Sequence, residues 1–203
     1  MEQGGALIPS LFTLRRIAYS IKEDRNDMAT WNSRGLRGST LEDMINKTNE
    51  KYRENGLALI QKIPTPITPI KMEPETRHIT LAYFEQKSTV DYIGAVQGIP
   101  VCFDAKECAT DTFPIQNIHV HQVEFMREFE RQDGISFIII YFSAKDEFYY
   151  IPFSDIINFW ERSENGGRKS FTYSEINQDF RIYANHGIPV HYLEAIQKDI
   201  ELR

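Results

Sequence analysis

The sequence contains little cysteine and no long apolar run. Its two cysteines, Cys102 and Cys108, have neither the spacing of a zinc site nor that of a disulfide framework, which is typical of a protein of the reducing cytosol. No apolar run approaches the roughly 18 residues that a membrane-spanning helix needs. The first residues contain no basic segment and no clear cleavage site, so we expect no signal peptide, a cytoplasmic location and no membrane partner.

An excess of positive charge is also missing. The 23 lysines and arginines against 29 aspartates and glutamates give a net charge of −6, unlike a general nucleic-acid binder. This balance does not exclude such a binder, because a local basic surface matters more than the total charge. The 203 residues, 41% hydrophobic and 12% aromatic, predict one globular domain with a substantial core.

The most informative stretch runs from Thr89 to Glu107 and predicts a β-hairpin. Gln97-Gly98 is the expected two-residue turn, which pairs Val96 with Ile99. Continuing this register pairs the following residues on one apolar face: Tyr92 with Phe103, Val90 with Ala105, and Gly94 with Val101.

The other face of the predicted hairpin carries charged residues. In the same register Asp91 opposes Asp104, and Thr89 opposes Lys106. Directly opposed residues have Cβ atoms roughly 5 Å apart, so the two carboxylates repel unless something such as a divalent cation offsets the repulsion. Lys106 projects from the same face as Asp104, and such a set suits phosphate chemistry. An exposed hairpin face with a chance ion pair explains the register equally well.

Serine and threonine begin the first clear helix. Ser39-Thr40-Leu41-Glu42 fits a capping box, and the helix is expected to end at Gly56. The local pattern favours Glu42 as the capping acid, with a metal site as the alternative. Residues 1–38 are expected to form a peripheral, mobile arm, within which a short amphipathic helix could contact a partner.

Prolines dominate the segment that follows a strand predicted over residues 57–63. Pro64, Pro66, Pro69 and Pro74 argue against a central strand, because proline cannot donate to the ladder. We therefore expect a protruding arm within residues 62–87 that returns along residues 79–84. The basic residues on or beside this arm, nearly balanced by three glutamates, are Lys62, Lys71, Arg77 and Lys87.

The second half of the chain alternates between helical and strand patterns. A loop is expected at 110–114, followed by a helix over 117–132 with Ile118, Phe125 and Phe129 inward. Gln122 lies on that apolar stripe and needs a partner. His119 and His121 are two apart and should not face one another on a helix, so we interpret them as structural or phosphate-contacting rather than as a metal pair.

The remaining segments predict a mixed β-sheet flanked by helices. Residues 135–142 are continuously apolar, as in a strand buried on both faces, and residues 147–151 form another strand. Helices are expected over 153–160 (with Trp160 in the core), 173–180 and 190–200, with a turn at 165–169. The predicted fold class is therefore α/β.

Several short motifs, in their order and spacing along the chain, resemble those of the RecU-type Holliday junction resolvases of the PD-(D/E)xK nuclease superfamily. The matching stretches are RGSTLEDMINKTNEKY (37–52), KIPTP (62–66), AYFEQKSTVDY (82–92), FDAKE (103–107), TFPIQNIHVHQ (112–122) and NFWER (158–162). The resemblance covers about residues 37–203. It implies a restriction-endonuclease-like core, with one nuclease domain over 39–203 and the proline-rich arm as a stalk that enters the junction.

The resemblance also implies roles for individual residues. The catalytic set would be Asp91, Asp104, Lys106, Glu42 and Gln122. Asp91 and Asp104 would bind Mg²⁺, with Mn²⁺ as a substitute, and Thr89 would lie beside the metal and the phosphate. The expected DNA contacts are Arg37, Lys62, Lys71, Arg77, Lys87 and Thr112.

As a whole, the resemblance implies a homodimer that makes paired cuts in four-way DNA during recombination and repair. It implies a nucleoid-associated protein that can contact recombinase and branch-migration proteins. Two departures stand out: Asp104 occupies a position where relatives often have glutamate, and the arm is shorter and less basic than is usual. The alternatives are a nuclease of the same fold that cuts other DNA structures, and a non-catalytic protein that binds junctions or modulates a recombinase.

Overall fold

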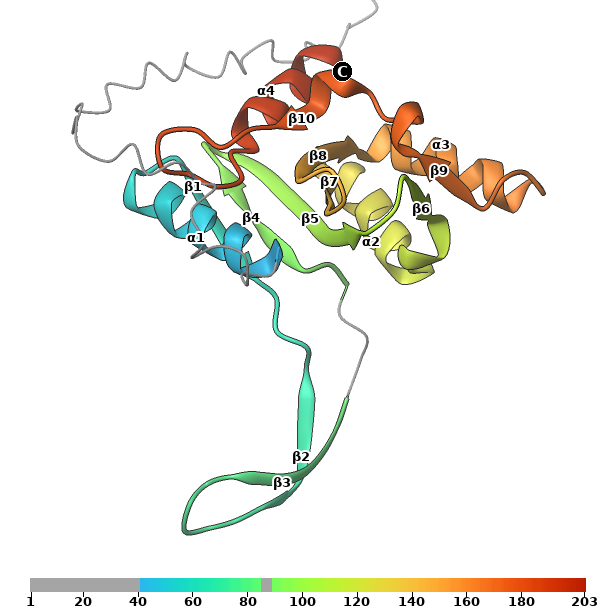
Figure 1. The fold of residues 1–203 in the computed structure, drawn as a ribbon. Coiled ribbons are helices and arrows are strands. Elements are labelled where there is room, and N and C mark those ends of the chain that lie inside the picture. Colours follow the sequence, from blue (N-terminus) through green and yellow to red (C-terminus); the bar gives the residue numbers. More distant parts are fainter. Residues whose placement is uncertain (1–40, 85–88) are drawn as a thin grey trace, which may run out of the picture.

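The computed structural model describes residues 41–84 and 89–203. Its centre is a six-stranded sheet in the order β1-β4-β5-β7-β8-β10 (Figure 1). These strands are β1 (Ala58–Lys62), β4 (Tyr92–Val96), β5 (Ile99–Cys108), β7 (Ile135–Phe142), β8 (Glu147–Pro152) and β10 (Arg181–Ile182). Strands β5 and β7 are parallel and the other neighbours are antiparallel, which confirms the predicted mixed sheet.

The β4–β5 hairpin has the predicted turn and register. Tyr92 pairs with Phe103 and Val96 with Ile99. Gln97 and Gly98 have φ angles of 49° and 92°, both positive, as the common two-residue hairpin turn requires. The ladder begins only at Tyr92, so the predicted pairings of residues 89–91 with β5 are wrong as strand pairings.

The failure of the register before Tyr92 has a local cause. The Asp91 N–H donates to a side-chain oxygen of Asp104 instead of a backbone carbonyl of β5. The Asp91 carbonyl accepts from Ile63 N–H at 2.8 Å, at the base of the arm. Val90 consequently lies in the core on the opposite side of the sheet from Tyr92, and not on one face with it as predicted.

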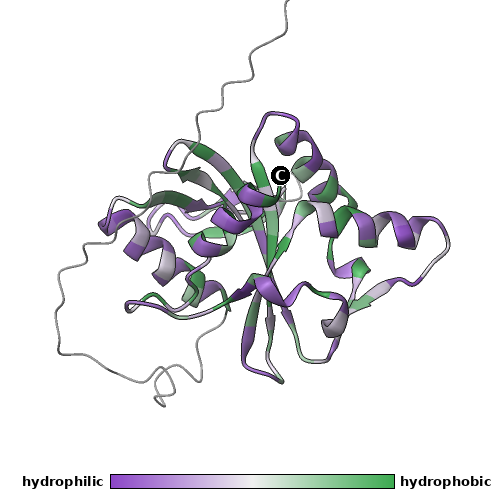
Figure 2. Ribbon diagram, turned by 90° about the horizontal axis from the view of Figure 1, so that it is seen from above, coloured by the Kyte–Doolittle hydropathy of each residue, from purple (hydrophilic) through white to green (hydrophobic). Residues whose placement is uncertain are grey.

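Helices cover both faces of the sheet. On one face lie α1 (Leu41–Glu54) and α4 (Leu193–Leu202), and on the other lie α2 (Val120–Glu130) and α3 (Phe153–Glu164). Successive residues of β7 belong alternately to the two cores, which confirms a strand buried on both faces. Figure 2 shows polar and apolar residues mixed along each helix, as expected for amphipathic helices on a sheet.

The predicted arm is present as a separate two-stranded antiparallel sheet. It consists of β2 (Ile67–Met72) and β3 (Ile79–Phe84), and it projects away from the central sheet (Figure 1). The pairing shifts register between Pro69 and Lys71, within the proline-containing strand. Proline removes a ladder donor, so a two-stranded ribbon with an irregular ladder accommodates it where a central strand would not.

Several expectations for the second half are wrong. The expected loop at 110–114 contains β6 (Thr112–Pro114), which pairs with β9 (Ser170–Thr172). The expected helix over 173–180 is two 3₁₀ turns, η2 (Tyr173–Glu175) and η3 (Gln178–Phe180), and a third, η1 (Ile115–Asn117), precedes α2. These differences involve contacts between segments that are distant in the sequence. The spacing of apolar residues along the chain does not report such contacts.

Smaller corrections concern which side chains are buried. Helix α2 buries Val123 and Met126 with Gln122, while Phe125 and Phe129 are only half-buried. Trp160 is also half-buried and packs at the edge of the core. The helix expected from residue 190 begins at Leu193. Within the described residues, no helix is long and apolar enough to cross a membrane.

Some expectations fall on residues that the structure does not describe. These are the N-terminal arm over 1–38 with Arg37, the capping residues Ser39 and Thr40, and Lys87. The predicted helix itself is present as α1, with Leu41, Ile45, Thr48 and Tyr52 all buried. It ends as expected, where Gly56 adopts a φ of 65°.

Candidate active site

Two strands and one helix bring together four of the five candidate catalytic residues. Asp91 lies immediately before β4, and Asp104 and Lys106 project from β5. Gln122 reaches them from the first turn of α2. Asp104 and Lys106 are two apart on a strand and therefore share a face, as predicted.

The two carboxylates hold each other through reciprocal backbone hydrogen bonds. The Asp91 N–H donates to Asp104 Oδ1 at 3.1 Å, and the Ala105 N–H donates to Asp91 Oδ2 at 3.0 Å. Hydrogen bonds from N–H groups to a carboxylate are about twice as strong as neutral ones. These amides therefore offset part of the repulsion between the acids and fix their orientation.

Asp104 is fully buried and its second oxygen has two further partners. Gln122 Nε2 donates to Asp104 Oδ2 at 3.0 Å, and Lys106 Nζ forms an ion pair with the same oxygen. Gln122 is itself oriented by the His119 N–H, which donates to its Oε1 at 2.9 Å. The predicted need of Gln122 for a polar partner is thus met by Asp104.

Burial dominates the electrostatics of this carboxyl group. Loss of solvent is the largest cause that raises the pKa of Asp104 well above its ordinary value, and the neighbouring Asp91 carboxylate raises it further. The Lys106 ammonium group acts in the opposite direction and lowers the pKa. A bound cation would add to the effect of Lys106 and favour the ionised form.

The oxygens of Asp91 and Asp104 fit a hard divalent cation. Mg²⁺ prefers oxygen ligands, usually keeps several waters, and is commonly held by one or two carboxylates together with substrate phosphate. The described residues contain no group of three or more histidine, cysteine, aspartate or glutamate side chains able to hold a metal. A metal here would therefore rest on the two aspartates, with water or phosphate oxygens completing its shell.

The other predicted site residues are placed less centrally. Glu42 lies in the first turn of α1 and forms an ion pair with Lys62, at the end of β1. Thr89 is half-buried, two residues before Asp91. Thr112 lies in β6, half-buried.

Lys71 and Arg77, the predicted DNA contacts on the arm, are both exposed. Lys71 belongs to β2, and Arg77 lies in the turn between β2 and β3. Both side chains are therefore accessible to solvent, and their contact with DNA stays a prediction.

The two histidines contradict one expectation. Their rings stack at 5.4 Å between centroids, because His119 precedes α2 with an extended backbone and is not a helical neighbour of His121. Their interpretation as structural or phosphate-contacting residues stays a prediction.

One contact next to this site, on the opposite face of β5, was not expected from the sequence. Glu107 Oε1 accepts the Leu41 N–H at 2.9 Å and so binds the first turn of α1. The capping pattern named Glu42, whose predicted cap at Ser39 lies outside the described residues, and Glu42 itself is paired with Lys62. The only available signal was strand alternation, which places Glu107 on the opposite face of β5 from Lys106.

The fold and the site together define a class: an α/β core in which the residue before β4 and strand β5 present two carboxylates and a lysine, as in the PD-(D/E)xK pattern. The sequence model of the family described as "RecU: Recombination protein U" matches residues 36–198. The chain therefore belongs to the RecU family.

Curated relatives agree with this membership. A protein named "Holliday junction resolvase RecU" from Levilactobacillus brevis is 42% identical over 169 residues, which are 81% of this chain and 84% of the relative. Proteins of the same name from Geobacillus kaustophilus (42% identical; 79% and 80% covered) and Bacillus cytotoxicus (41% identical; 71% and 74% covered) are similarly close. A solved structure of Archaeoglobus fulgidus Hjc, a Holliday junction resolvase, has a TM-score of 0.36 at 8% identity over 56% of this chain and 77% of its own, too distant to support an argument.

Proposed function

We propose that this chain is a metal-dependent endonuclease that resolves four-way DNA junctions by paired hydrolysis of phosphodiester bonds. The observation that carries the proposal is the Asp91–Asp104 pair, held by reciprocal amides, with Lys106 on the second acid. The names of its relatives support junction DNA as the substrate, in recombination and repair.

Each residue of the site has a part in the proposed reaction. Mg²⁺, or Mn²⁺ in its place, would be held by Asp91 and Asp104. It would polarise the scissile phosphate and make a bound water more acidic. Lys106, whose side chain is 20% exposed, places an ammonium group beside Asp104. It stabilises charge on the scissile phosphate or orients the attacking water. Gln122 keeps Asp104 in position. Thr89 would lie beside the metal and the phosphate, and Glu42 would be an additional acid of the site.

The arm supports a homodimer. Its apolar side chains are exposed to solvent: Ile67, Ile70, Met72, Ile79, Leu81, Tyr83 and Phe84. A two-stranded ribbon is at best marginally stable by itself, and a contiguous exposed apolar surface marks an interaction site. Pairing with the arm of a second copy covers this surface. The resulting two-fold symmetry presents two sites to a junction that is itself approximately two-fold symmetric.

The remaining parts of the proposal concern organisation and contacts. Residues 39–203 form one nuclease domain with a stalk within 62–87, and residues 1–38 are peripheral. The DNA contacts are Arg37, Lys62, Lys71, Arg77, Lys87 and Thr112. The protein acts in the cytoplasm at the nucleoid, where recombinase and branch-migration proteins are its further partners.

A cleavage assay tests this function directly. We expect the purified chain to cut a four-way junction with Mg²⁺ and not with EDTA, and to cut duplex and single-stranded DNA poorly. Equal cutting of duplex would indicate a nuclease for other DNA structures. Binding of the junction without cutting would indicate a non-catalytic junction-binding protein.

Substitutions locate the reaction at the proposed site. Asp91→Asn and Asp104→Asn should abolish cleavage and leave junction binding largely intact, because each removes a metal ligand charge and neither residue contacts DNA phosphate. Asp133→Asn makes the same change in an exposed turn after α2 and should cut normally. Appreciable Mg²⁺-dependent cleavage by either site variant would contradict the assignment.

A further inference from the structure

The base of the arm contacts two acids of the candidate site. Lys62 is the last residue of β1, and the chain leaves the central sheet for the arm at Ile63. Lys62 Nζ forms an ion pair with Glu42, and the Ile63 N–H donates to the Asp91 carbonyl at 2.8 Å. Two consecutive residues thus join the arm to α1 and to the segment that carries Asp91.

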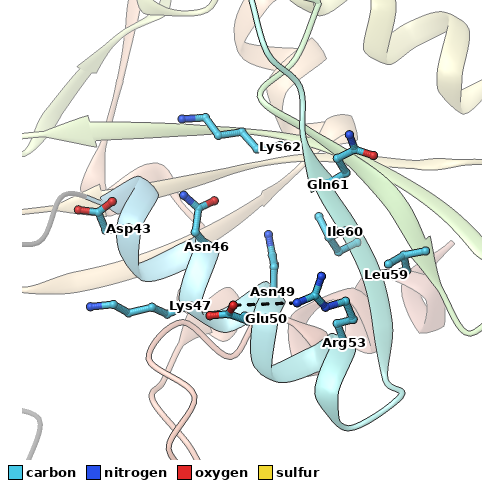
Figure 3. A pocket seen from close by; sticks show the side chains of 10 residues that line it. All are labelled: Asp43, Asn46, Lys47, Asn49, Glu50, Arg53, Leu59, Ile60, Gln61 and Lys62. Carbon is cyan, nitrogen blue, oxygen red and sulfur yellow. Dashed lines mark ion pairs between the residues drawn. The ribbon is translucent and has the colours of Figure 1, made fainter.

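The Lys62–Glu42 pair is open to solvent and to ligands. The two side chains are 42% and 49% exposed. Figure 3 shows Lys62 extending from β1 toward the first turn of α1, at the edge of a groove of about 630 Å³ that Asp43 and Lys47 also line. A phosphate can therefore approach the Lys62 ammonium group, and the lysine has room to turn away from Glu42.

Glu42 is linked to the strand residue that directly follows Asp91. The Tyr92 hydroxyl donates to the Glu42 carbonyl at 3.5 Å and to Asn46 Oδ1 at 3.1 Å. Tyr92 follows Asp91 in the chain and pairs with Lys62 between β4 and β1, so the residue that holds Glu42 lies next to the segment that carries Asp91. The backbone of this turn is held on β5 by the hydrogen bond from Leu41 N–H to Glu107, whereas the Glu42 side chain is exposed and, among the described residues, free of such a backbone restraint.

We propose that Lys62 keeps Glu42 from the Asp91–Asp104 site until a DNA phosphate takes the lysine, so that phosphate and Mg²⁺ bind cooperatively. This inference rests on the proposed function and names how the same site is regulated. An ammonium group paired with a carboxylate competes with a cation for that carboxylate, and phosphate competes for the ammonium group. Such coupling is reciprocal: Mg²⁺ must strengthen phosphate binding by the factor by which phosphate strengthens Mg²⁺ binding.

The expected change in Mg²⁺ affinity is limited because the Lys62–Glu42 ion pair is exposed to solvent. Exposed ion pairs contribute at most about 1 kcal/mol, which corresponds to a change of about five-fold in a binding constant. Removing the lysine charge should therefore strengthen Mg²⁺ binding in the absence of DNA by about two- to five-fold.

Calorimetric titration of Mg²⁺ into the full chain without DNA tests the inference. We expect Lys62→Gln to bind Mg²⁺ about two- to five-fold more tightly than the unchanged chain. Lys47→Gln removes the same charge from the same groove without breaking the pair, and its Mg²⁺ affinity should change clearly less. In a Glu42→Gln background, Lys62→Gln should have no further effect. Equal gains for Lys62→Gln and Lys47→Gln, or a gain that survives Glu42→Gln, would overturn the inference.

The Asp91→Asn variant separates this inference from the proposed function. If it abolishes Mg²⁺ binding while Lys62→Gln binds like the unchanged chain, the metal site stands and the role of Lys62 is refuted. If the unchanged chain binds no Mg²⁺, or if Asp91→Asn binds it normally, the proposed metal site itself is refuted, and the inference with it.

Discussion

Consecutive residues of β5 serve opposite faces of the sheet. Lys106 turns toward Asp104 on the face covered by α2, whereas Glu107 accepts the Leu41 N–H on the face covered by α1. The first N–H groups of a helix have no partner within the helix. A negative charge beside them also interacts favourably with the positive end of the helix dipole. One strand thus carries both the Asp104–Lys106 ion pair and the anchor of a neighbouring helix.

Replacing Glu107 by alanine should lower the free energy of unfolding by about 1 kcal/mol, the usual cost of a lost helix cap. Glu107→Gln keeps an acceptor oxygen and loses only the charge, so it should lose less than half of that. Urea denaturation of the two variants measures both values. Equal losses would show that the charge of Glu107, and not its hydrogen bond to Leu41, provides the stabilisation.

Among the elements, the short strand β9 and the turn η2 are held to α3 by one carboxylate. Glu175 accepts from the Thr172 N–H at 2.8 Å and from Arg162 at 2.5 Å. Arg162, on α3, also donates to the Ser170 carbonyl at 2.7 Å. Elements of three residues have little stability of their own, so these contacts between elements hold them in place.

The pKa of Glu175 makes this anchor dependent on pH. The hydrogen bond from Arg162, followed by that from the Thr172 N–H, lowers the pKa to about 2. Because the folded pKa lies below the unfolded value of about 4.3, the stabilisation is complete above about pH 4.3 and is lost as the pH falls through about 2. Glu175→Gln should therefore be less stable at pH 7 by about 1 kcal/mol, a value reduced for solvent screening, and this deficit should vanish near pH 2.

Urea denaturation across a pH series measures this difference. Glu164→Gln, an exposed position on the same helix as Arg162, is the matched control and should differ little from the unchanged chain at any pH. A deficit in Glu175→Gln that persists undiminished at pH 2 would mean that shape, and not charge, explains the contribution of Glu175.

The whole molecule combines an acidic body with a projecting arm. The net charge is −6, and yet Lys71 and Arg77 are exposed on the arm, which extends away from the central sheet (Figure 1). Nonspecific DNA binding is driven by neutralising phosphates, so an acidic chain should bind plain duplex weakly. Under the proposed function, selectivity for a junction would then depend on two linked sites of a homodimer that engage it together.

Neutralising Lys71 and Arg77 together should weaken junction binding more than duplex binding. The dependence of affinity on salt should also become shallower, by up to roughly two units if both side chains contact phosphate. The measurement is the Kd for both DNAs over a salt series, with Arg131→Gln and Lys198→Gln on the body as a control of equal charge. Equal losses on both DNAs would mark the arm as a generic phosphate contact, and no loss would mean that it does not enter the junction.

Elements with a strong local pattern were predictable, and elements paired over a distance were not. The turn at Gln97-Gly98, the doubly buried β7 and the proline-containing arm follow from residues that are near one another in the sequence. The β6–β9 pairing joins segments about 60 residues apart, and nothing in either segment indicates its partner. Trp160 and the phenylalanines of α2 were misplaced because burial depends on what packs opposite them.

For the site, the sequence by itself determined which chemical groups are present and that Asp104 and Lys106 share a face, since strand alternation is a local property. It also indicated that Gln122 needs a polar partner. Only the tertiary structure decided that this partner is Asp104, that Glu107 holds α1, and that Lys62 pairs with Glu42. The physical reason is that hydrogen bonds and ion pairs depend on distances of a few ångströms, which packing of the sheet and helices sets and residue spacing along the chain does not.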